Sequence, residues 1–263
     1  MEQNRMPLML RILMGSLTWC CLWAISVFAQ TTASTLRPCC EVTNLGLQKI
    51  ALKQYKRSGQ YDRDIKTVVD QAKSYLALEA GRKGRLAIVL DIDETALSNW
   101  PRIEADDFGF FSAGDCKLKS DGTVQAPCGW DKWIGLKQDR PIVPTRELYD
   151  QARKQGLKVF FITNRNESQR AVTAKNLNTV GYEGFSDEDL IMTPDKLGGG
   201  RNPRLIACFK SQAPTACFKT EMRGEIVDRG YTIILNMGDQ DSDLSGGYAE
   251  RTFKLPNPFY YVP

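Results

Sequence analysis

Residues 86–95 read LAIVLDIDET, an apolar run followed by a polar turn that contains Asp91 and Asp93. A short, continuous apolar run is typical of a strand that is buried on both faces of a parallel sheet. Carboxylates directly after such a strand lie at the carboxyl edge of the sheet, where ligands of open α/β proteins bind. Surface turns also produce Asp-x-Asp pairs, so the meaning of this pair depends on the residues at the ends of the other strands.

Two later apolar strands end in polar clusters of the same kind. Residues 158–162 precede TNR at 163–165, and residues 231–237 precede GDQDSD at 238–243. Two shorter strands are expected, at 190–192 and 252–254. Helical periodicity predicts helices within 42–80 and at 144–155, 167–179 and 218–229. Strands that alternate with helices indicate an α/β fold, a parallel sheet flanked by helices with additional N-terminal helices.

Residues 98–143 differ from the rest of the chain and are interpreted as a cap insertion. They are rich in Gly, Pro and aromatic residues and show little periodicity. The glycines at 198–200 lie within residues 196–216, which are predicted to be a loop. The cap aromatics are expected to form mainly the core of this lobe, with one or two stacking on a substrate: Trp100, Phe108, Phe110, Phe111, Trp130 and Trp133.

The chain of 263 residues contains no histidine, which excludes several classes of enzyme. Ser-His-Asp hydrolases, Cys-His enzymes, HExxH zinc enzymes and phosphohistidine phosphatases all need an imidazole. Catalysis therefore has to use carboxylates, Lys, Tyr, Cys, hydroxyls or a metal held by oxygen ligands. The formal charge of +4 comes from 35 basic and 31 acidic residues. This even balance does not indicate a nucleic-acid polymer as a partner.

Residues 1–29 are predicted to be a secretory signal peptide, and 30–263 a single mature domain. Arg5 and Arg11 give a positive start, residues 12–28 are uncharged and mostly apolar, and small residues at positions 27 and 29 precede a cleavage site. An uncleaved membrane anchor is the alternative, although a span usually needs ~20 apolar residues. We therefore expect a periplasmic or secreted protein without a membrane span after cleavage.

The cysteines support export, because six of the eight remain after the predicted signal. An even number in an exported chain indicates disulfides. Cys116 with Cys128, and Cys208 with Cys217, would each close a short loop punctuated by Gly or Pro, so local pairing is the simplest connectivity. Cys39 and Cys40 have no evident partner. A zinc site is not favoured, because the chain has neither a CxxC pair nor a histidine.

The polar clusters occur in a set order: DxDxT after one strand, TNR after the next, a lysine early in a helix, then GDxxxD. In these motifs the sequence resembles the haloacid dehalogenase (HAD) superfamily. More narrowly, it resembles the secreted acid phosphatases of subfamily IIIB, a class B/C-like branch that includes the plant vegetative storage proteins. The resemblance covers about residues 55–260 and is carried by AIVLDIDETALSN (87–99), FITNR (161–165), FKT (218–220) and NMGDQDSDL (236–244).

This resemblance implies a Rossmann-like core with a cap over the strand ends, and it implies roles for four catalytic residues. Asp91 corresponds to the nucleophile, which forms an aspartyl-phosphate. Asp93 corresponds to the general acid that protonates the leaving alcohol and then to the base that activates water. Thr163 and the amide after it would hold the phosphoryl oxygens, and Lys219 would balance their charge. As alternatives, Thr163 could be only a helix N-cap and Lys219 a solvated helix residue.

The resemblance also implies a magnesium site made of oxygen ligands, as Mg²⁺ prefers. Asp239 would bind the ion together with the carboxylate of Asp91 and the backbone carbonyl of Asp93, and Asp243 would support it through water. Asp241 is a third acid of the same motif that could compete for the metal. The sequence also departs from many superfamily members at Glu94, where they carry glycine, although the acid-phosphatase branch tolerates glutamate there.

The function expected from the sequence is that of an exported, Mg²⁺-dependent acid phosphatase acting on small phosphomonoesters. One alternative is a narrow 5′-nucleotidase that uses the same core with a selective cap. Another is a non-catalytic storage or binding protein, since plant relatives of that kind can lose the nucleophile. The nucleophile position is intact here as Asp91, which favours an enzyme.

Overall fold

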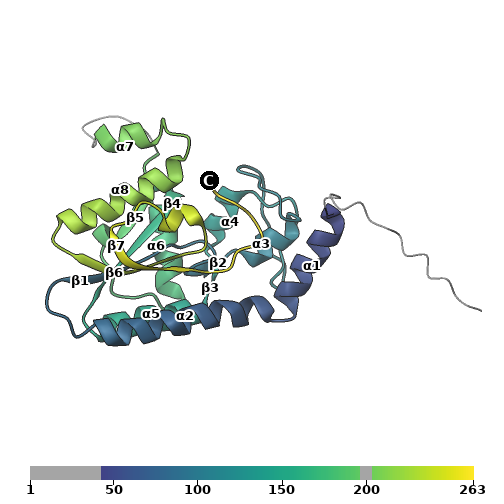
Figure 1. Ribbon diagram of the computed structural model, residues 1–263. Helices are drawn as coiled ribbons and strands as arrows, with labels where there is room; N and C mark the ends of the chain where they lie inside the picture. Colours follow the sequence, from purple (N-terminus) through teal and green to yellow (C-terminus); the bar gives the residue numbers. More distant parts are fainter. Residues whose placement is uncertain (1–42, 196–202) are drawn as a thin grey trace, which may run out of the picture. The chain divides into compact units, whose positions relative to one another are not determined.

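The centre of the fold is a sheet of five parallel strands in the order β5-β4-β1-β6-β7. The computed structural model describes residues 43–195 and 203–263. Within them the strands are β1 Leu86–Leu90, β4 Lys158–Asn166, β5 Leu190–Thr193, β6 Thr232–Gly238 and β7 Ala249–Lys254. The predicted parallel α/β sheet is therefore confirmed (Figure 1).

Strand β1 lies in the middle of the sheet and is buried on both faces. It pairs in parallel with β4 and β6, with Val89 opposite Phe160 on one side and Asn236 on the other. Ile88 and Leu90 belong to the larger hydrophobic core, whereas the alternate residues Ala87 and Val89 belong to the smaller one. This double burial is the physical reason that residues 86–90 are all apolar.

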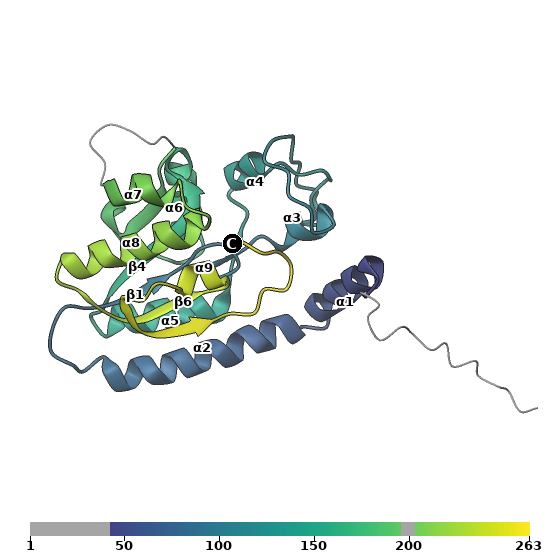
Figure 2. The same ribbon diagram turned by 45° about the horizontal axis from the view of Figure 1, so that its top comes forward.

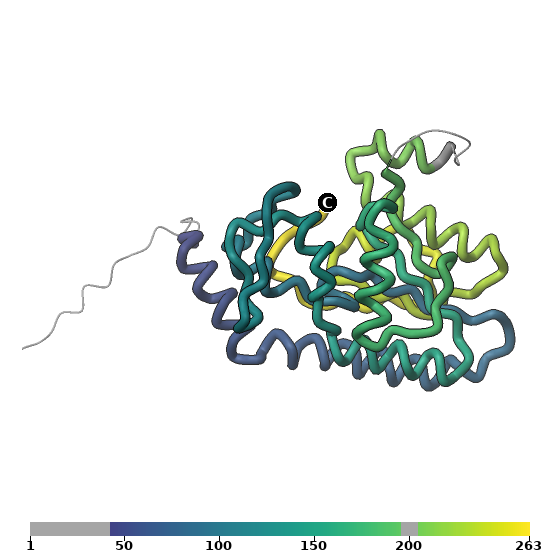
Figure 3. The backbone as a smooth tube through the Cα atoms, turned by 180° about the vertical axis from the view of Figure 1, so that it is seen from behind, coloured from purple at the N-terminus to yellow at the C-terminus, as the bar shows by residue number. Residues whose placement is uncertain are grey.

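Helices cover both faces of this sheet. The long α2 (Gln60–Glu79) and α5 (Val143–Lys154) pack on one face, and α8 (Pro214–Asp228) packs on the other (Figures 1 and 3). Helix α1 (Leu45–Arg57) precedes α2, and α6 (Arg170–Thr179) connects β4 to β5. Helices within 42–80 and at 144–155 were expected, and both are present.

A lobe formed by residues 97–141 leaves the sheet after β1 and returns before α5. Its base is a two-stranded antiparallel sheet of β2 (Leu97–Ser98) and β3 (Arg140–Pro141). Between them lie α3 (Trp100–Ala105), α4 (Trp130–Leu136) and the Cys116–Cys128 disulfide. The lobe has its own small core, formed by Cys116, Val124, Cys128, Trp133 and Ile134. Figure 2 shows this lobe beside the carboxyl edge of the sheet.

The predicted loop at 196–216 is wrong in its second half. Residues Pro203–Cys208 form α7, and α8 already begins at Pro214 rather than near 218. Proline is favoured in the first turn of a helix, where its missing N–H has no partner to lose. The predicted Cys208–Cys217 disulfide is present and joins α7 to the first turn of α8. A packing partner and a crosslink thus stabilise α7, which is only six residues long, and the first turn of α8.

The predicted signal peptide and the two cysteines at 39 and 40 lie outside the described residues. Among the residues that are described, no helix combines the length and the apolar character needed to cross a membrane. The last strand is longer than expected, since β7 covers 249–254. Beyond it, residues 255–262 run back over the carboxyl edge of the sheet toward the lobe (Figure 2).

Candidate active site

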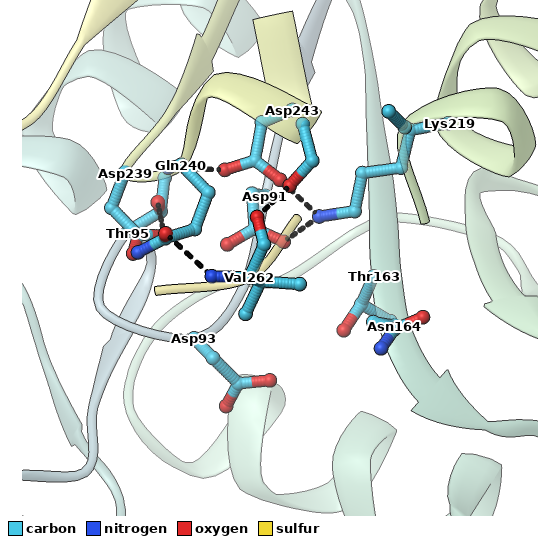
Figure 4. Close-up of polar contacts among 12 residues, drawn as sticks. Asp91, Asp93, Thr95, Thr163, Asn164, Lys219, Asp239, Gln240, Asp243 and Val262 are labelled. Carbon is cyan, nitrogen blue, oxygen red and sulfur yellow. Dashed lines mark hydrogen bonds and ion pairs between the residues drawn. The ribbon is translucent and has the colours of Figure 1, made fainter. Parts of the chain in front are cut away.

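The carboxyl ends of three adjacent strands bring the predicted site residues together. Asp91 follows β1, Thr163 lies in β4, and Asp239 follows β6. The backbone N–H of Asp91 donates to the carbonyl of Met237 at 3.0 Å, which extends the pairing of β1 with β6 into the turn. Because parallel strands all end at the same edge, motifs that are far apart in the sequence meet in one polar cluster (Figure 4).

Lys219 of α8 joins two of the carboxylates. Its Nζ donates to Oδ1 of Asp91 at 2.6 Å and to Oδ1 of Asp243 at 2.5 Å. Burial lowers the pKa of Lys219, but the carboxylates of Asp243 and Asp91 outweigh this and raise it, so the ammonium stays charged. Lys219 is 4% exposed and is therefore not a solvated helix residue. Arg223, one turn later, donates to backbone carbonyls that include that of Asp243, as expected of a structural partner.

Asp239 is held by three side-chain donors. Thr95 Oγ1 donates to Oδ1 of Asp239 at 3.1 Å, whereas Gln240 Nε2 and Asn257 Nδ2 donate to Oδ2 at 2.7 and 2.6 Å. Asp239 is only 1% exposed. Burial, followed by the nearby carboxylate of Asp243, raises the pKa of Asp239 to about 6. The orientation of this side chain is thus defined by neighbours from three segments of the chain.

The donor set of the cluster fits a hard divalent cation. Carboxylate oxygens of Asp91, Asp239 and Asp243 all lie within 4.8 Å of one another, and all three residues are buried. Only Lys219 compensates their charge by direct contact within the described residues. Burial and the neighbouring carboxylates raise the pKa of Asp91 well above its usual value, against the effect of Lys219. Mg²⁺ would relieve this repulsion through the oxygen ligands it prefers. Asp241 is exposed and lies outside the cluster.

Asp93 lies apart from this cluster (Figure 4) and, like the cluster, lines the cavity described below. The guanidinium of Arg165 donates several hydrogen bonds to the Asp93 carboxylate. Nη2 donates to Oδ1 at 2.7 Å, and Nε donates to Oδ1 at 3.1 Å and to Oδ2 at 3.2 Å. The amide of Asn99 also donates to Oδ1 at 2.9 Å, and Asn99 in turn accepts from Trp133 Nε1 at 2.8 Å. Arg165 further pairs with the buried Asp139 at 3.3 Å.

Arg165 contacts a predicted site residue, Asp93, although no role was predicted for it from the sequence alone. It stands in the FITNR motif only two positions after Thr163, and that position is the signal that was available. A fully buried arginine has to be paired, because an unpaired charge is costly to bury. The side chain of Arg165 is 0% exposed, and it meets that requirement through Asp93 and Asp139.

Thr163 is fully buried, and the residue after it, Asn164, lines the cavity. The hydroxyl of Thr163 accepts a hydrogen bond from the backbone N–H of Arg165 at 3.1 Å. It is not a helix N-cap, because the following turn, Glu167–Gln169, is capped by Asn166. Thr163 itself does not line the cavity, so it lies just behind the wall to which Asn164 contributes.

The contacts of the Glu94 side chain give a reason why this chain carries glutamate where many superfamily members carry glycine. Glu94 has a φ of 55°, a region that favours glycine, and is fully buried. Tyr61 of α2 donates to its Oε2 at 2.7 Å, and the backbone N–H of Asn99 donates to its Oε1 at 2.5 Å. Burial raises the pKa of Glu94 to about 7 against the lowering effect of these two hydrogen bonds. The carboxylate thus connects the turn after β1 to α2 and to the start of the lobe.

A cavity of about 350 Å³ opens over the polar cluster. The cap contributes three aromatic residues to its walls, and the segment after β7 contributes three more, which the sequence analysis did not identify: Phe108, Phe110 and Trp130, then Phe259, Tyr260 and Tyr261. Trp133 is instead fully buried in the core of the lobe, and Phe111 is 44% exposed outside the cavity. The expectation that the cap aromatics form mainly the core of the lobe is therefore wrong, since only Trp133 belongs to that core and Trp130 packs against it. The expected stacking of one or two of them on a substrate stays a prediction.

The fold and the cluster together define a hydrolase with an aspartate-based site on a HAD-type core. The chain belongs to the HAD superfamily, subfamily IIIB (acid phosphatase), whose family model matches residues 40–263. It is accordingly a phosphomonoesterase, and the resemblance found in the sequence motifs is confirmed.

The relatives with curated descriptions include an acid phosphatase, a stem glycoprotein and a vegetative storage protein. Acid phosphatase 1 of Solanum lycopersicum is 32% identical over 213 residues, which is 80% of this chain and 73% of the relative. The stem 28 kDa glycoprotein of Glycine max is 34% identical, covering 81% and 74% of the two chains. Vegetative storage protein 1 of Arabidopsis thaliana is 30% identical, covering 78% and 67%.

The fold is also similar to that of a solved bacterial structure. The class C acid phosphatase from Bacillus anthracis superposes with a TM-score of 0.60, covering 82% of this chain and 86% of that one. The two sequences are 22% identical, so the likeness concerns the fold.

Proposed function

We propose that this protein is an exported, Mg²⁺-dependent acid phosphatase that hydrolyses small phosphomonoesters through an aspartyl-phosphate. The observation that carries the proposal is the contact between Asp91 and Lys219 at the end of β1, 2.6 Å long and open to a cavity of about 350 Å³. A carboxylate next to a fixed ammonium can approach an anionic phosphoryl group that it would otherwise repel.

In the first half-reaction, Asp91 attacks phosphorus and the bond to the leaving oxygen breaks. The ammonium of Lys219 offsets the charge shared by the nucleophile and the phosphoryl oxygens. Thr163 would donate its hydroxyl hydrogen to one of these oxygens, while its hydroxyl oxygen accepts from the N–H of Arg165. The amide that follows Thr163 binds the same group. These contacts hold the phosphoryl group in line with the leaving oxygen.

Asp93 moves the proton in both half-reactions. It first donates a proton to the leaving alcohol oxygen, and it then takes a proton from the water that attacks the aspartyl-phosphate. The second step releases inorganic phosphate and restores the Asp91 carboxylate. Arg165 and Asn99 orient Asp93 from two sides. As the general acid, Asp93 has to enter the first step as the carboxylic acid.

Asp91, Asp239 and the backbone carbonyl of Asp93 would hold Mg²⁺, with Asp243 supporting the ion through water. When bound, Mg²⁺ supplies charge stabilisation to the phosphoryl oxygens and the nucleophile. Both oxygens of Asp243 already accept hydrogen bonds, from Lys219 Nζ and from the backbone N–H of Gln240 at 2.8 Å. These contacts support an indirect role for Asp243.

Export to the periplasm or the exterior is supported by the two disulfides, Cys116–Cys128 and Cys208–Cys217. Disulfides persist in oxidising compartments and are rare in the cytosol. A narrower 5′-nucleotidase activity is a second candidate, because aromatic rings on the cavity walls offer stacking surfaces to a nucleobase. A storage role without catalysis is disfavoured by the intact Asp91–Lys219 pair.

The test is the substitution Asp91→Asn in the purified protein, with p-nitrophenyl phosphate as substrate. Turnover should fall below a few per cent of the wild-type value while the circular dichroism spectrum stays unchanged. Asp241→Asn is the matched control, because Asp241 is exposed and outside the cluster, and it should retain turnover. A folded Asp91→Asn protein with substantial turnover would exclude Asp91 as the nucleophile.

A further inference from the structure

Residues 257–262, which we call the closing segment, return from β7 to the active site (Figure 2). Phe259, Tyr260, Tyr261 and Val262 all line the cavity over Asp91. Phe259 anchors the segment, since it is 4% exposed and its ring packs against those of Tyr61, Trp100 and Phe108. The segment is therefore part of the active-site wall.

The closing segment makes a direct contact with the acidic cluster. Asn257 Nδ2 donates to Oδ2 of Asp239 at 2.6 Å. The other end of the same amide is occupied, because Asn257 Oδ1 accepts from the backbone N–H of Phe259 at 2.9 Å. This second bond determines which end of the amide faces Asp239. The geometry therefore presents a donor, not an acceptor, to the carboxylate.

A second connection runs through Gln240. Its Oε1 accepts from the backbone N–H of Val262 at 3.1 Å, while its Nε2 donates to Oδ2 of Asp239 at 2.7 Å (Figure 4). Ser242 Oγ adds a hydrogen bond to the carbonyl of Val262 at 3.1 Å. Both donors on Oδ2 of Asp239 thus depend on the closing segment: Asn257 is part of it, and Gln240 is hydrogen-bonded to its residue Val262.

We propose that Asn257 is a positioning residue for Asp239, and that the closing segment presets this carboxylate for Mg²⁺. The inference rests on the proposed function, in which Asp239 is a metal ligand. Groups that hydrogen-bond to a metal ligand fix its orientation, and their loss typically weakens metal affinity roughly 10–100-fold. Without Asn257, Thr95 still donates to Oδ1 and Gln240 still donates to Oδ2, but Oδ2 loses one of its two donors and the carboxylate is oriented less tightly.

The experiment is a calorimetric titration of the metal-free, full-length protein with MgCl₂. We expect the Kd of Asn257→Leu, which keeps the size of the side chain but not its donor, to rise roughly tenfold or more. Asn257→Ala is a second variant in case leucine disturbs packing. The matched control is Asn178→Ala on the exposed side of α6, which should bind Mg²⁺ like the wild type.

A steady-state readout separates positioning from general damage. At saturating Mg²⁺, both Asn257 variants should keep kcat within about twofold of wild type, while the Mg²⁺ concentration for half-maximal activity rises with the Kd. Unchanged Mg²⁺ affinity in both folded variants, with a wild type that binds the ion, would overturn the inference and leave the proposed function intact. A wild type that binds no Mg²⁺ would overturn both.

Discussion

Replacing Arg165 by methionine is expected to destabilise the protein strongly. The guanidinium is completely buried and pairs with Asp139, which is also completely buried, and with Asp93, which is 18% exposed. Removing one member of a buried ion pair leaves an uncompensated charge and costs roughly 3–5 kcal/mol. Asp139 should dominate this cost, because its Oδ1 has no hydrogen-bond partner and Arg165 donates to its Oδ2. Asp93 retains Asn99 and some solvent, so we expect a total near the lower value.

The assay is urea unfolding at neutral pH, followed by circular dichroism. The double variant Arg165→Met with Asp139→Asn should recover at least ~1 kcal/mol of the loss, because it no longer buries an unpaired charge at position 139. Arg170→Met is the matched control: Arg170 is paired with Glu167 but 27% exposed, and its loss should cost at most ~1 kcal/mol. A loss below ~1 kcal/mol for Arg165→Met, or no recovery in the double variant, would refute the reasoning.

Three other outcomes are expected. Chelation with EDTA should abolish phosphatase activity and added Mg²⁺ should restore it, because the buried carboxylates of the cluster repel one another without a cation; full activity in protein with no measurable metal would contradict this. Burial raises the pKa of Asp139 to about 6 in the folded protein, which means that the fold favours the protonated side chain. This contribution to the free energy of unfolding is complete below the pKa of the unfolded state and is lost as the pH rises through the pKa of the folded state. Asp139→Asn, which cannot ionise, should therefore gain stability relative to wild type as the pH rises through this window, and a difference independent of pH in urea unfolding would exclude the titration of Asp139 as a cause. Phe110→Leu and Trp130→Leu should change the ratio of kcat/KM between an aryl and an aliphatic phosphate by more than about twofold, or ~0.5 kcal/mol, whereas Phe111→Leu, which lies outside the cavity, should not; equal ratios in all three would mean that the cap aromatics only pack.

The sequence by itself determined the sheet, the edge at which the site lies and the chemistry of its main residues. An apolar run such as residues 86–90 can be buried only between two layers, and its end then has to lie at the sheet edge. The absence of histidine limited catalysis to carboxylates, Lys, Tyr, Cys, hydroxyls or a metal held by oxygen ligands. Local disulfide pairing was also predictable from the sequence, because each pair closes a short loop.

Only the tertiary structure decided which side chains support those residues. Arg165 gains its role from Asp139, a residue of the lobe, and Asn257 gains its role from the return of the segment after β7 to Asp239. Neither contact has a local signal, because each joins segments that are distant in sequence and meet only when the fold closes. Helix α7 was not predicted because six residues are too few to show a periodic pattern. Packing on the core and the Cys208–Cys217 crosslink stabilise this helix. The periodicity of apolar residues in the sequence shows which face of a helix or strand is buried. It does not show which side chain pairs with a buried polar group, because that depends on how the sheet, the helices and the lobe pack together.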